Sequence, residues 1–203
     1  MEKLNNNQLN NSPVRGLGGN AWGANFWSAF RLTFFLLLIC AIIYPLLVLG
    51  IAKITPDQGY GEKITDKNGK TYFANIGQKF DKDVYFHSRP SAVDYNAAGS
   101  GGSNKGPTNP EYLKTVQERV NEFRAKNPDA EIPVDMVTAG GSGLDPHVSV
   151  TAAEAQINRV ASARNISPEK IKELVNKHTE KLFFGPARIN VLKLNIELDK
   201  MNN

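Results

Sequence analysis

The sequence has little that would allow disulfide or thiolate chemistry, since it contains one cysteine, Cys40, in 203 residues. A single cysteine forms no intramolecular disulfide and builds no thiolate metal site alone, so a disulfide scaffold and a structural zinc site are excluded. The 17 glycines and 11 prolines are too few for a collagen-like or low-complexity chain. One ordinary globular domain, or one domain with an anchor, is what the length then allows.

The chain also lacks a strong charge of one sign. Its 24 Lys and Arg residues against 20 Asp and Glu give a net charge of +4, spread along the whole sequence. This excess is too small and too scattered to indicate binding to nucleic acid.

One long apolar run is present at residues 32–54, with the sequence LTFFLLLICAIIYPLLVLGIAKI and no charge before Lys53. As a helix, its uncharged part is about 30 Å long, which matches the hydrocarbon core of a bilayer. We predict a retained transmembrane helix, because the run is too long for a cleaved signal peptide. Pro45 removes a backbone donor, which predicts a kink or a packed neighbouring helix there. Lys and Arg flank both sides, so charge alone leaves the orientation open.

The remaining chain predicts a mobile, Asn- and Gly-rich tail at 1–31 and an α+β domain at 55–203, with a small sheet covered by helices. Capping residues and apolar stripes predict three helices, and runs of β-forming residues predict strands. The expected helices are 110–126, 151–164 and a third from Ser167 onward; the expected strands are 188–198, 134–138, 72–76 and 84–86.

Two Gly- and Ser-rich segments, 97–110 and 138–149, interrupt this domain. Long glycine loops cost chain entropy and bury little, so they are the expected place for function. A phosphate-binding P-loop ending at Lys105 fails because Asn104 and Gly106 replace the required glycine and hydroxyl residue. A serine-hydrolase elbow around Ser142 fails because position 144 is Leu.

Asp145 and His147 are candidates for an acid–base pair or for half of a metal site. The favoured alternative is structural, since Asp145 precedes a proline and an aspartate there commonly holds loop amides. His87 and His178 lack the spacing of metal ligands, so we predict structural roles for both. Several arginines are candidates for an anion site, with Arg89 foremost because Pro90 makes its loop rigid; the others are Arg119, Arg124, Arg159 and Arg164.

The order of these segments resembles the C subunit of the bacterial Kdp complex, an ATP-driven, high-affinity potassium importer. The resemblance rests on a single N-terminal spanning helix followed by five blocks in order. These are YFHSRPSA at 85–92, GGSNKGPTNP at 101–110, DMVTAGGSGLDPHVS at 135–149, AEAQINRVASARN at 153–165 and INVLKLNIELD at 189–199.

The resemblance implies a non-catalytic accessory subunit with no cofactor of its own, held in the bacterial inner membrane with its domain outside. Its implied partners are a channel-like potassium-binding subunit and a P-type ATPase subunit, whose ATP affinity it raises as a catalytic chaperone. The resemblance further implies nucleotide-motif or partner-interface residues in the loops and after them, and membrane packing at Pro45. The candidates are Arg89 before the loops, then Ser103, Asn104, Ser142, Gly143, Asp145 and His147 within them, and Gln156 after them.

An outward domain conflicts with direct ATP contact, because cytoplasmic ATP lies beyond about 30 Å of hydrocarbon. Any effect on ATP would then be a coupling free energy carried through the membrane subunits. The alternative function from another class is a membrane-anchored extracytoplasmic hydrolase that uses His147 and Asp145 on a cell-envelope substrate.

Overall fold

The computed structural model describes residues 21–181 and 183–201, and the chain divides into two units between Gly59 and Tyr60. Residues 1–20 of the predicted tail lie outside the described residues. The last part of the predicted tail is helical: the first helix begins at Ala21, whereas the sequence predicted a start at Leu32.

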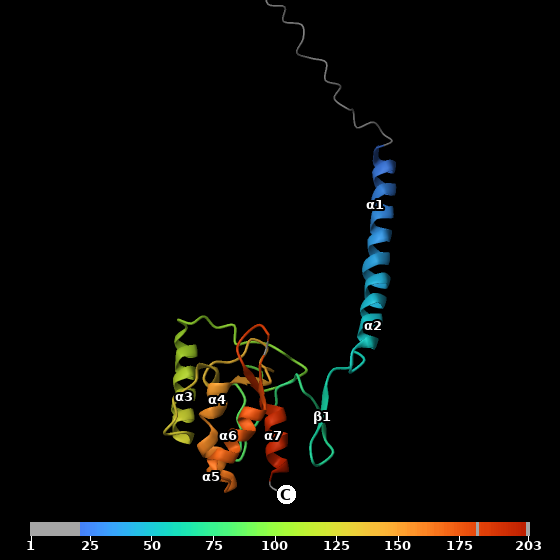
Figure 1. The fold of residues 1–203 in the computed structure, drawn as a ribbon. Coiled ribbons are helices and arrows are strands. Elements are labelled where there is room, and N and C mark those ends of the chain that lie inside the picture. Colours follow the sequence, from blue (N-terminus) through green and yellow to red (C-terminus); the bar gives the residue numbers. More distant parts are fainter. Residues whose placement is uncertain (1–20, 182, 202–203) are drawn as a thin grey trace, which may run out of the picture. The chain divides into compact units, whose positions relative to one another are not determined.

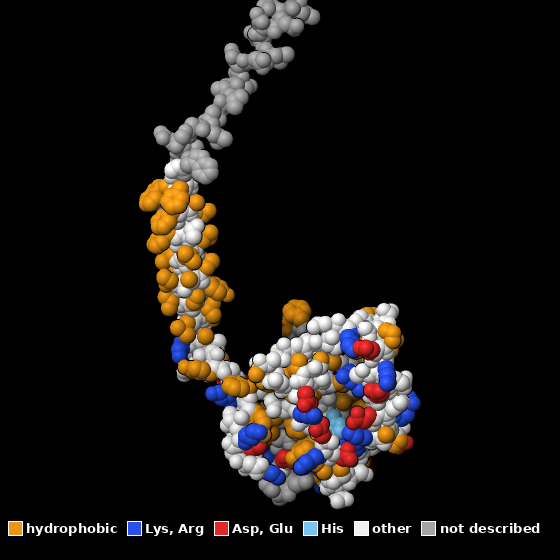
Figure 2. Space-filling model, turned by 180° about the vertical axis from the view of Figure 1, so that it is seen from behind, with side chains coloured by type: hydrophobic (Ala, Val, Ile, Leu, Met, Phe, Trp, Pro, Cys, Tyr) orange, Lys and Arg blue, Asp and Glu red, His pale blue; other side chains and the backbone are white. Residues whose placement is uncertain are grey.

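The first unit is one helix in three consecutive parts, α1 (Ala21–Leu37), a π-helical turn η1 (Leu38–Ile43) and α2 (Tyr44–Ile54). Its segment Asn25–Ile54, 30 residues with a mean hydropathy of 2.9, is long and apolar enough to cross a membrane. Figure 2 shows hydrophobic side chains along the surface of this helix. The π-helical turn directly precedes Pro45, whose missing donor disturbs the regular hydrogen-bond pattern of the preceding turn.

The second unit contains two small antiparallel sheets. Strand β1 (Lys63–Thr65) pairs with β2 (Thr71–Phe73) across a turn in which the Asp66 carboxylate accepts from the N–H groups of Asn68 and Lys70. The second sheet has the order β3-β5-β4, with β5 in the centre. Its strands are β3 (His147–Ser149), β4 (Thr179–Glu180) and β5 (Arg188–Asn190).

Helices pack against the three-stranded sheet, which confirms the α+β class. In Figure 1, α4, α5, α6 and α7 group beside this sheet, and α3 lies at the edge of the domain. The helices are α3 (Pro110–Lys126), α4 (Val150–Glu154), α5 (Ile157–Arg164), α6 (Pro168–Lys177) and α7 (Val191–Lys200), with a 3-10 turn η2 (Val134–Met136).

The core is apolar, and four hydrogen-bonded side-chain amides are buried in the described part of the chain, of which those of Gln156 and Asn195 are the least exposed; the others are Asn127 and Asn190. Asn195 accepts from the N–H of Phe86 and donates to its carbonyl, both at 2.9 Å. Phe86, which is fully buried, therefore needs no neighbouring strand to satisfy its backbone. The predicted strand 84–86 is wrong for this reason.

The predicted strand 188–198 is correct only for Arg188–Asn190, since Val191–Lys200 is the helix α7. Asn190 caps this helix, and its side-chain oxygen accepts from the N–H of Lys193 at 3.1 Å. Val191, Leu194 and Leu198 are fully buried at helical spacing. The alternating leucines of this segment are compatible with one face of a strand and also with one face of a helix. The N-cap at Asn190 favours the helix.

Other boundaries also differ from the predictions. Residues 134–138 contain a 3-10 turn after Pro133 instead of a strand, and the strand predicted at 72–76 is Thr71–Phe73. The helix predicted at 151–164 is two helices, and it begins after Ser149, whose hydroxyl accepts from the N–H of Ala152. The cap at Asn109 and the helix 110–126 are confirmed.

Candidate functional site

The two glycine-rich loops pack directly against each other. The N–H of Gly101 and the hydroxyl of Ser100 both donate to the carbonyl of Ser142, at 2.9 and 3.0 Å. Gly143 has a φ of +67°, and a Cβ there would lie 2.7 Å from the carbonyl oxygen of Gly101. This contact between the loops therefore requires glycine at position 143.

The segment that contains Arg89 holds the second loop in place. The hydroxyl of Ser91 donates to the carbonyl of Gly143 at 2.6 Å and accepts from the N–H of Tyr95 at 2.9 Å. The hydroxyl of Tyr95 in turn donates to the carbonyl of Arg89. Burial raises the pKa of the Tyr95 phenol to about 12, so it stays protonated as a donor.

Asp145 connects this segment to the sheet. One carboxylate oxygen accepts from the N–H of His147 at 3.0 Å, and the other accepts from Nη1 of Arg89 at 3.2 Å. The His147 imidazole, then its backbone N–H and the Arg89 guanidinium hold the pKa of the Asp145 carboxyl below its usual range, while partial burial opposes them. These are the contacts of a carboxylate that fixes a loop.

His147, on β3, lies between two carboxylates. Its Nδ1 is 3.6 Å from Oδ1 of Asp145, and its Nε2 is 3.6 Å from Oε2 of Glu180, which also contacts Nε of Arg188 at 3.3 Å. Polar contacts thus connect Arg89, Asp145, His147, Glu180 and Arg188 in a continuous series. Glu180 and Arg188 were not predicted from the sequence, and the signal that could have found them is the pairing of β4 with β5.

Gln156 is fully buried in the interior, whereas Ser103 and Asn104 are exposed. The Oε1 atom of Gln156 accepts from the N–H of His87 at 2.7 Å and from Nη2 of Arg159 at 2.8 Å. Its Nε2 donates to the carbonyls of His87 and Ala152. The structure thus brings Arg89, Ser142, Asp145 and His147 together near the surface, around the buried Gly143, and it places Gln156 inside as a structural amide.

The two other histidines are partly buried. Burial, followed by the charges of Arg159 and Lys126, lowers the pKa of His87 to about 4, so this imidazole is neutral at pH 7. Burial also lowers the pKa of His178. Among residues 21–181 and 183–201, no group of three or more His, Cys, Asp or Glu side chains is placed to hold a metal ion.

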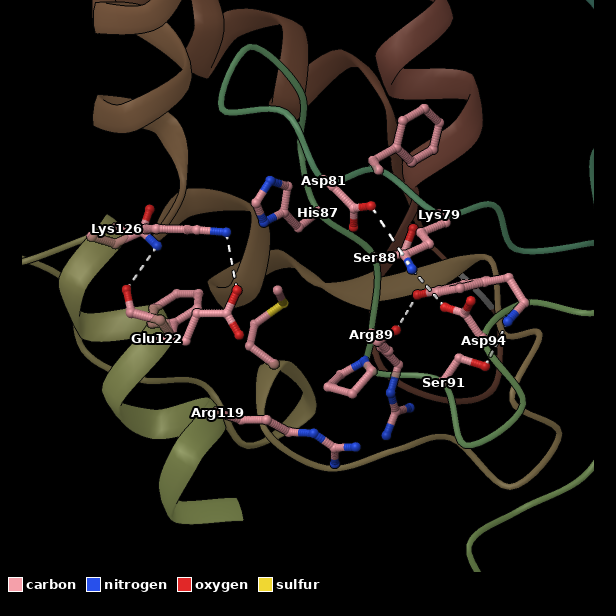
Figure 3. Close-up of a pocket in the computed structure, with 16 residues that line it drawn as sticks. Lys79, Asp81, His87, Ser88, Arg89, Ser91, Asp94, Arg119, Glu122 and Lys126 are labelled. Atoms are coloured by element: carbon pink, nitrogen blue, oxygen red, sulfur yellow. Dashed lines mark hydrogen bonds and ion pairs between the residues drawn. The ribbon is translucent and has the colours of Figure 1, made fainter. Parts of the chain in front are cut away.

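A pocket of about 270 Å³ adjoins the Arg89 segment (Figure 3). Its wall comes from residues 79–95, from α3 and from Met136. Two arginines line this pocket from two different parts of the chain, since Arg89 lies in the segment 79–95 and Arg119 lies on α3. The chemistry that this arrangement allows is recognition of an anionic group.

Comparison with known proteins identifies the family. A family model described as "KdpC: K+-transporting ATPase, c chain" matches residues 26–200. The chain belongs to the KdpC family. The matched span contains most of the apolar helix and every helix and strand of the second unit, so both units are KdpC structure.

Curated KdpC relatives match at similar length. The "Potassium-transporting ATPase KdpC subunit" of Flavobacterium johnsoniae is 50% identical over 181 residues, 87% of this chain and 98% of the relative. The protein of the same description in Geobacter metallireducens is 48% identical over 172 residues, which cover 81% of this chain and 91% of the relative. That of Bacillus cereus strain Q1 is 41% identical over 179 residues, covering 84% and 93%.

Proposed function

We propose that this chain is a non-catalytic accessory subunit of an ATP-driven potassium import complex, needed for its assembly and activity. The observation that carries the proposal is the KdpC match over residues 26–200, supported by relatives described as subunits of a potassium-transporting ATPase. A subunit of this kind works through the complex that it joins, and it has no reaction centre or cofactor of its own.

Its partners in this proposal are a channel-like potassium-binding subunit and a P-type ATPase subunit. An exposed aromatic pair on the domain supports a protein contact. Phe183 and Phe184 are 94% and 85% exposed and contact each other edge to face, with ring centroids 4.7 Å apart. Adjacent exposed aromatic rings gain free energy when a partner covers them, and such residues are typical of interface cores.

In this proposal the apolar helix spans the inner membrane, and the second unit lies outside the cytoplasm; the length and hydropathy of the helix support the first part. An effect on ATP then reaches the pump subunit as a coupling free energy through the membrane subunits. The buried position of Gln156 supports an indirect effect, because a ligand would have to displace four hydrogen bonds to reach its amide. Photo-crosslinking of labelled ATP to residues 138–156 in sealed vesicles would contradict the indirect effect.

Purification of the tagged chain from native membranes tests the proposal. We expect the two partner subunits to co-purify, and we expect removal of residues 55–203 to abolish assembly or potassium-dependent ATPase activity. Wild-type transport after this deletion would contradict an accessory role. Replacement of both Asp145 and His147 by Ala distinguishes the accessory subunit from the alternative hydrolase, because only a hydrolase would lose turnover of a cell-envelope substrate.

A further inference from the structure

The arginines of the domain differ in their surroundings. Arg159 and Arg164 serve the fold, since their side chains are only 6% and 4% exposed. Arg159 donates to the carbonyl of Asp83 at 2.6 Å. Arg164 donates to the carbonyl of Val84 at 2.6 Å and to the carboxylate of Asp199 at 2.7 Å. Neither guanidinium is available to a partner.

Arg89 and Arg119 are different, because both line the 270 Å³ pocket between the Arg89 segment and α3 (Figure 3). Arg119 makes one hydrogen bond, from Nη1 to the carbonyl of Val137 at 3.1 Å, and no carboxylate in the described part of the chain pairs with it. Arg89 pairs with Asp145 through Nη1, while its Nε is buried and has no partner. Buried N–H donors are almost always paired in folded proteins, so the Nε of Arg89 is expected to bind an acceptor that another molecule supplies.

The other charges of the pocket largely neutralise one another. Lys79 contacts Asp94 at 2.7 Å, and Lys126 contacts Glu122 at 3.1 Å, as the dashed lines in Figure 3 show. His87 is neutral at pH 7. Arg89 is paired with Asp145, so among the cationic lining residues Lys79, Arg89, Arg119 and Lys126 only Arg119 has no ion pair with a carboxylate in the described part of the chain.

Charge and size together select the group that fits. A guanidinium offers a planar fork of donors that matches a carboxylate or phosphate. The one unpaired guanidinium, that of Arg119, matches a singly charged carboxylate better than a doubly charged phosphate. The volume lies below the roughly 300–1,000 Å³ of typical small-molecule pockets, which favours one side chain over a nucleotide or a metabolite.

We propose that Arg89 and Arg119 form a receptor for the carboxylate of an Asp or Glu side chain of another subunit. The receptor rests on the proposed function, because it requires a subunit that delivers the acidic side chain. The aromatic lining of Phe80 and Phe123 surrounds the stem of that side chain, and the two guanidinium groups bind its charged end.

Carbodiimide coupling tests for a carboxylate directly. The variant Arg119→Lys places an amine at this position. The carbodiimide activates a carboxylate that contacts the amine, and the amine then attacks the activated carboxyl carbon. An amide bond forms, and the carbodiimide leaves as a urea. Applied to the intact membrane complex, the reaction is expected to join residue 119 to an acidic residue of another subunit, as identified by mass spectrometry. Arg124→Lys is the matched control, because Arg124 is exposed on the same helix and does not line the pocket.

The outcomes separate the receptor from the proposed function. An intact complex with no coupling at residue 119, with coupling only to Glu122 or Asp145 of the same chain, or with an anionic lipid in the pocket overturns the receptor alone. Purification of the unmodified chain without any other subunit overturns both. Arg119→Gln is further expected to weaken subunit association at least about tenfold, measured by dissociation with rising salt, while Arg124→Gln leaves it unchanged.

Discussion

The amide of Gln156 makes two hydrogen bonds with the backbone of a single residue, His87, which is 69 positions away in the sequence. Its oxygen accepts from the His87 N–H at 2.7 Å and its nitrogen donates to the His87 carbonyl at 3.3 Å. This pair of bonds fixes the segment before Arg89 to the start of α5. A buried amide thereby sets the position of a surface loop.

Gln156→Ala is expected to destabilise the domain strongly. The substitution leaves the N–H of His87 and the guanidinium of Arg159 without their buried acceptor, which costs about 2–4 kcal/mol. Chemical denaturation of the chain in detergent micelles measures the free energy of unfolding. Asn158→Ala, exposed on the same helix, is the control and should change it little. Unchanged stability with a loss of nucleotide affinity would instead indicate a ligand-binding amide.

Gly143→Ala is expected to disrupt the contact between the two loops. The new methyl group would lie 2.7 Å from the carbonyl oxygen of Gly101, and the φ of +67° is unfavourable for alanine, so we expect a loss of more than about 1 kcal/mol. Thermal denaturation checks this loss. Gly141→Ala is the matched control in the same loop, since its added Cβ meets open space. Equal effects of the two substitutions would contradict a specific requirement at position 143.

The sequence predicted those features that depend on neighbouring residues. The cap at Asn109, Pro110 and the apolar stripe define α3 within one segment, and α3 has the predicted bounds. The end of the chain was misassigned because its leucine alternation fits two structures, and the deciding cap at Asn190 is a single side chain. The candidate site depends on residues far apart: Asp145 meets Arg89 from 56 positions away, and no local pattern encodes that contact.

The low pKa of His87, about 4, makes the stability of the domain depend on pH. In the unfolded chain this imidazole titrates near 6.5, so between about 6.5 and 4 the unfolded state binds more protons than the folded state. The free energy of unfolding is therefore expected to be highest above pH 6.5 and to fall by up to about 3 kcal/mol as the pH decreases to 4. Denaturation at a series of pH values measures this slope.

His87→Gln is expected to flatten the slope between pH 6.5 and 4, because glutamine does not titrate. The titrating carboxyl Asp145 provides a second contribution at lower pH, since its folded pKa lies below the unfolded value and its stabilisation is lost only as the pH falls through that range. A slope that is unchanged in His87→Gln and absent in Asp145→Asn would assign the whole pH dependence to the carboxyl.

The exposed pair Phe183 and Phe184 gives a test of assembly that leaves the fold intact. Both side chains lie in the loop between β4 and β5 and contribute nothing to the buried core, so replacement of both by Ser should change the free energy of unfolding by less than about 0.5 kcal/mol. If another subunit covers the pair, the variant loses that apolar contact and co-purification of the complex from membranes should fall at least about tenfold. Leu113→Ser, at an exposed apolar site on α3, is the control and should retain the complex. Full assembly of the double variant, with the same salt and detergent resistance as the unmodified chain, would show that the aromatic pair is not an interface.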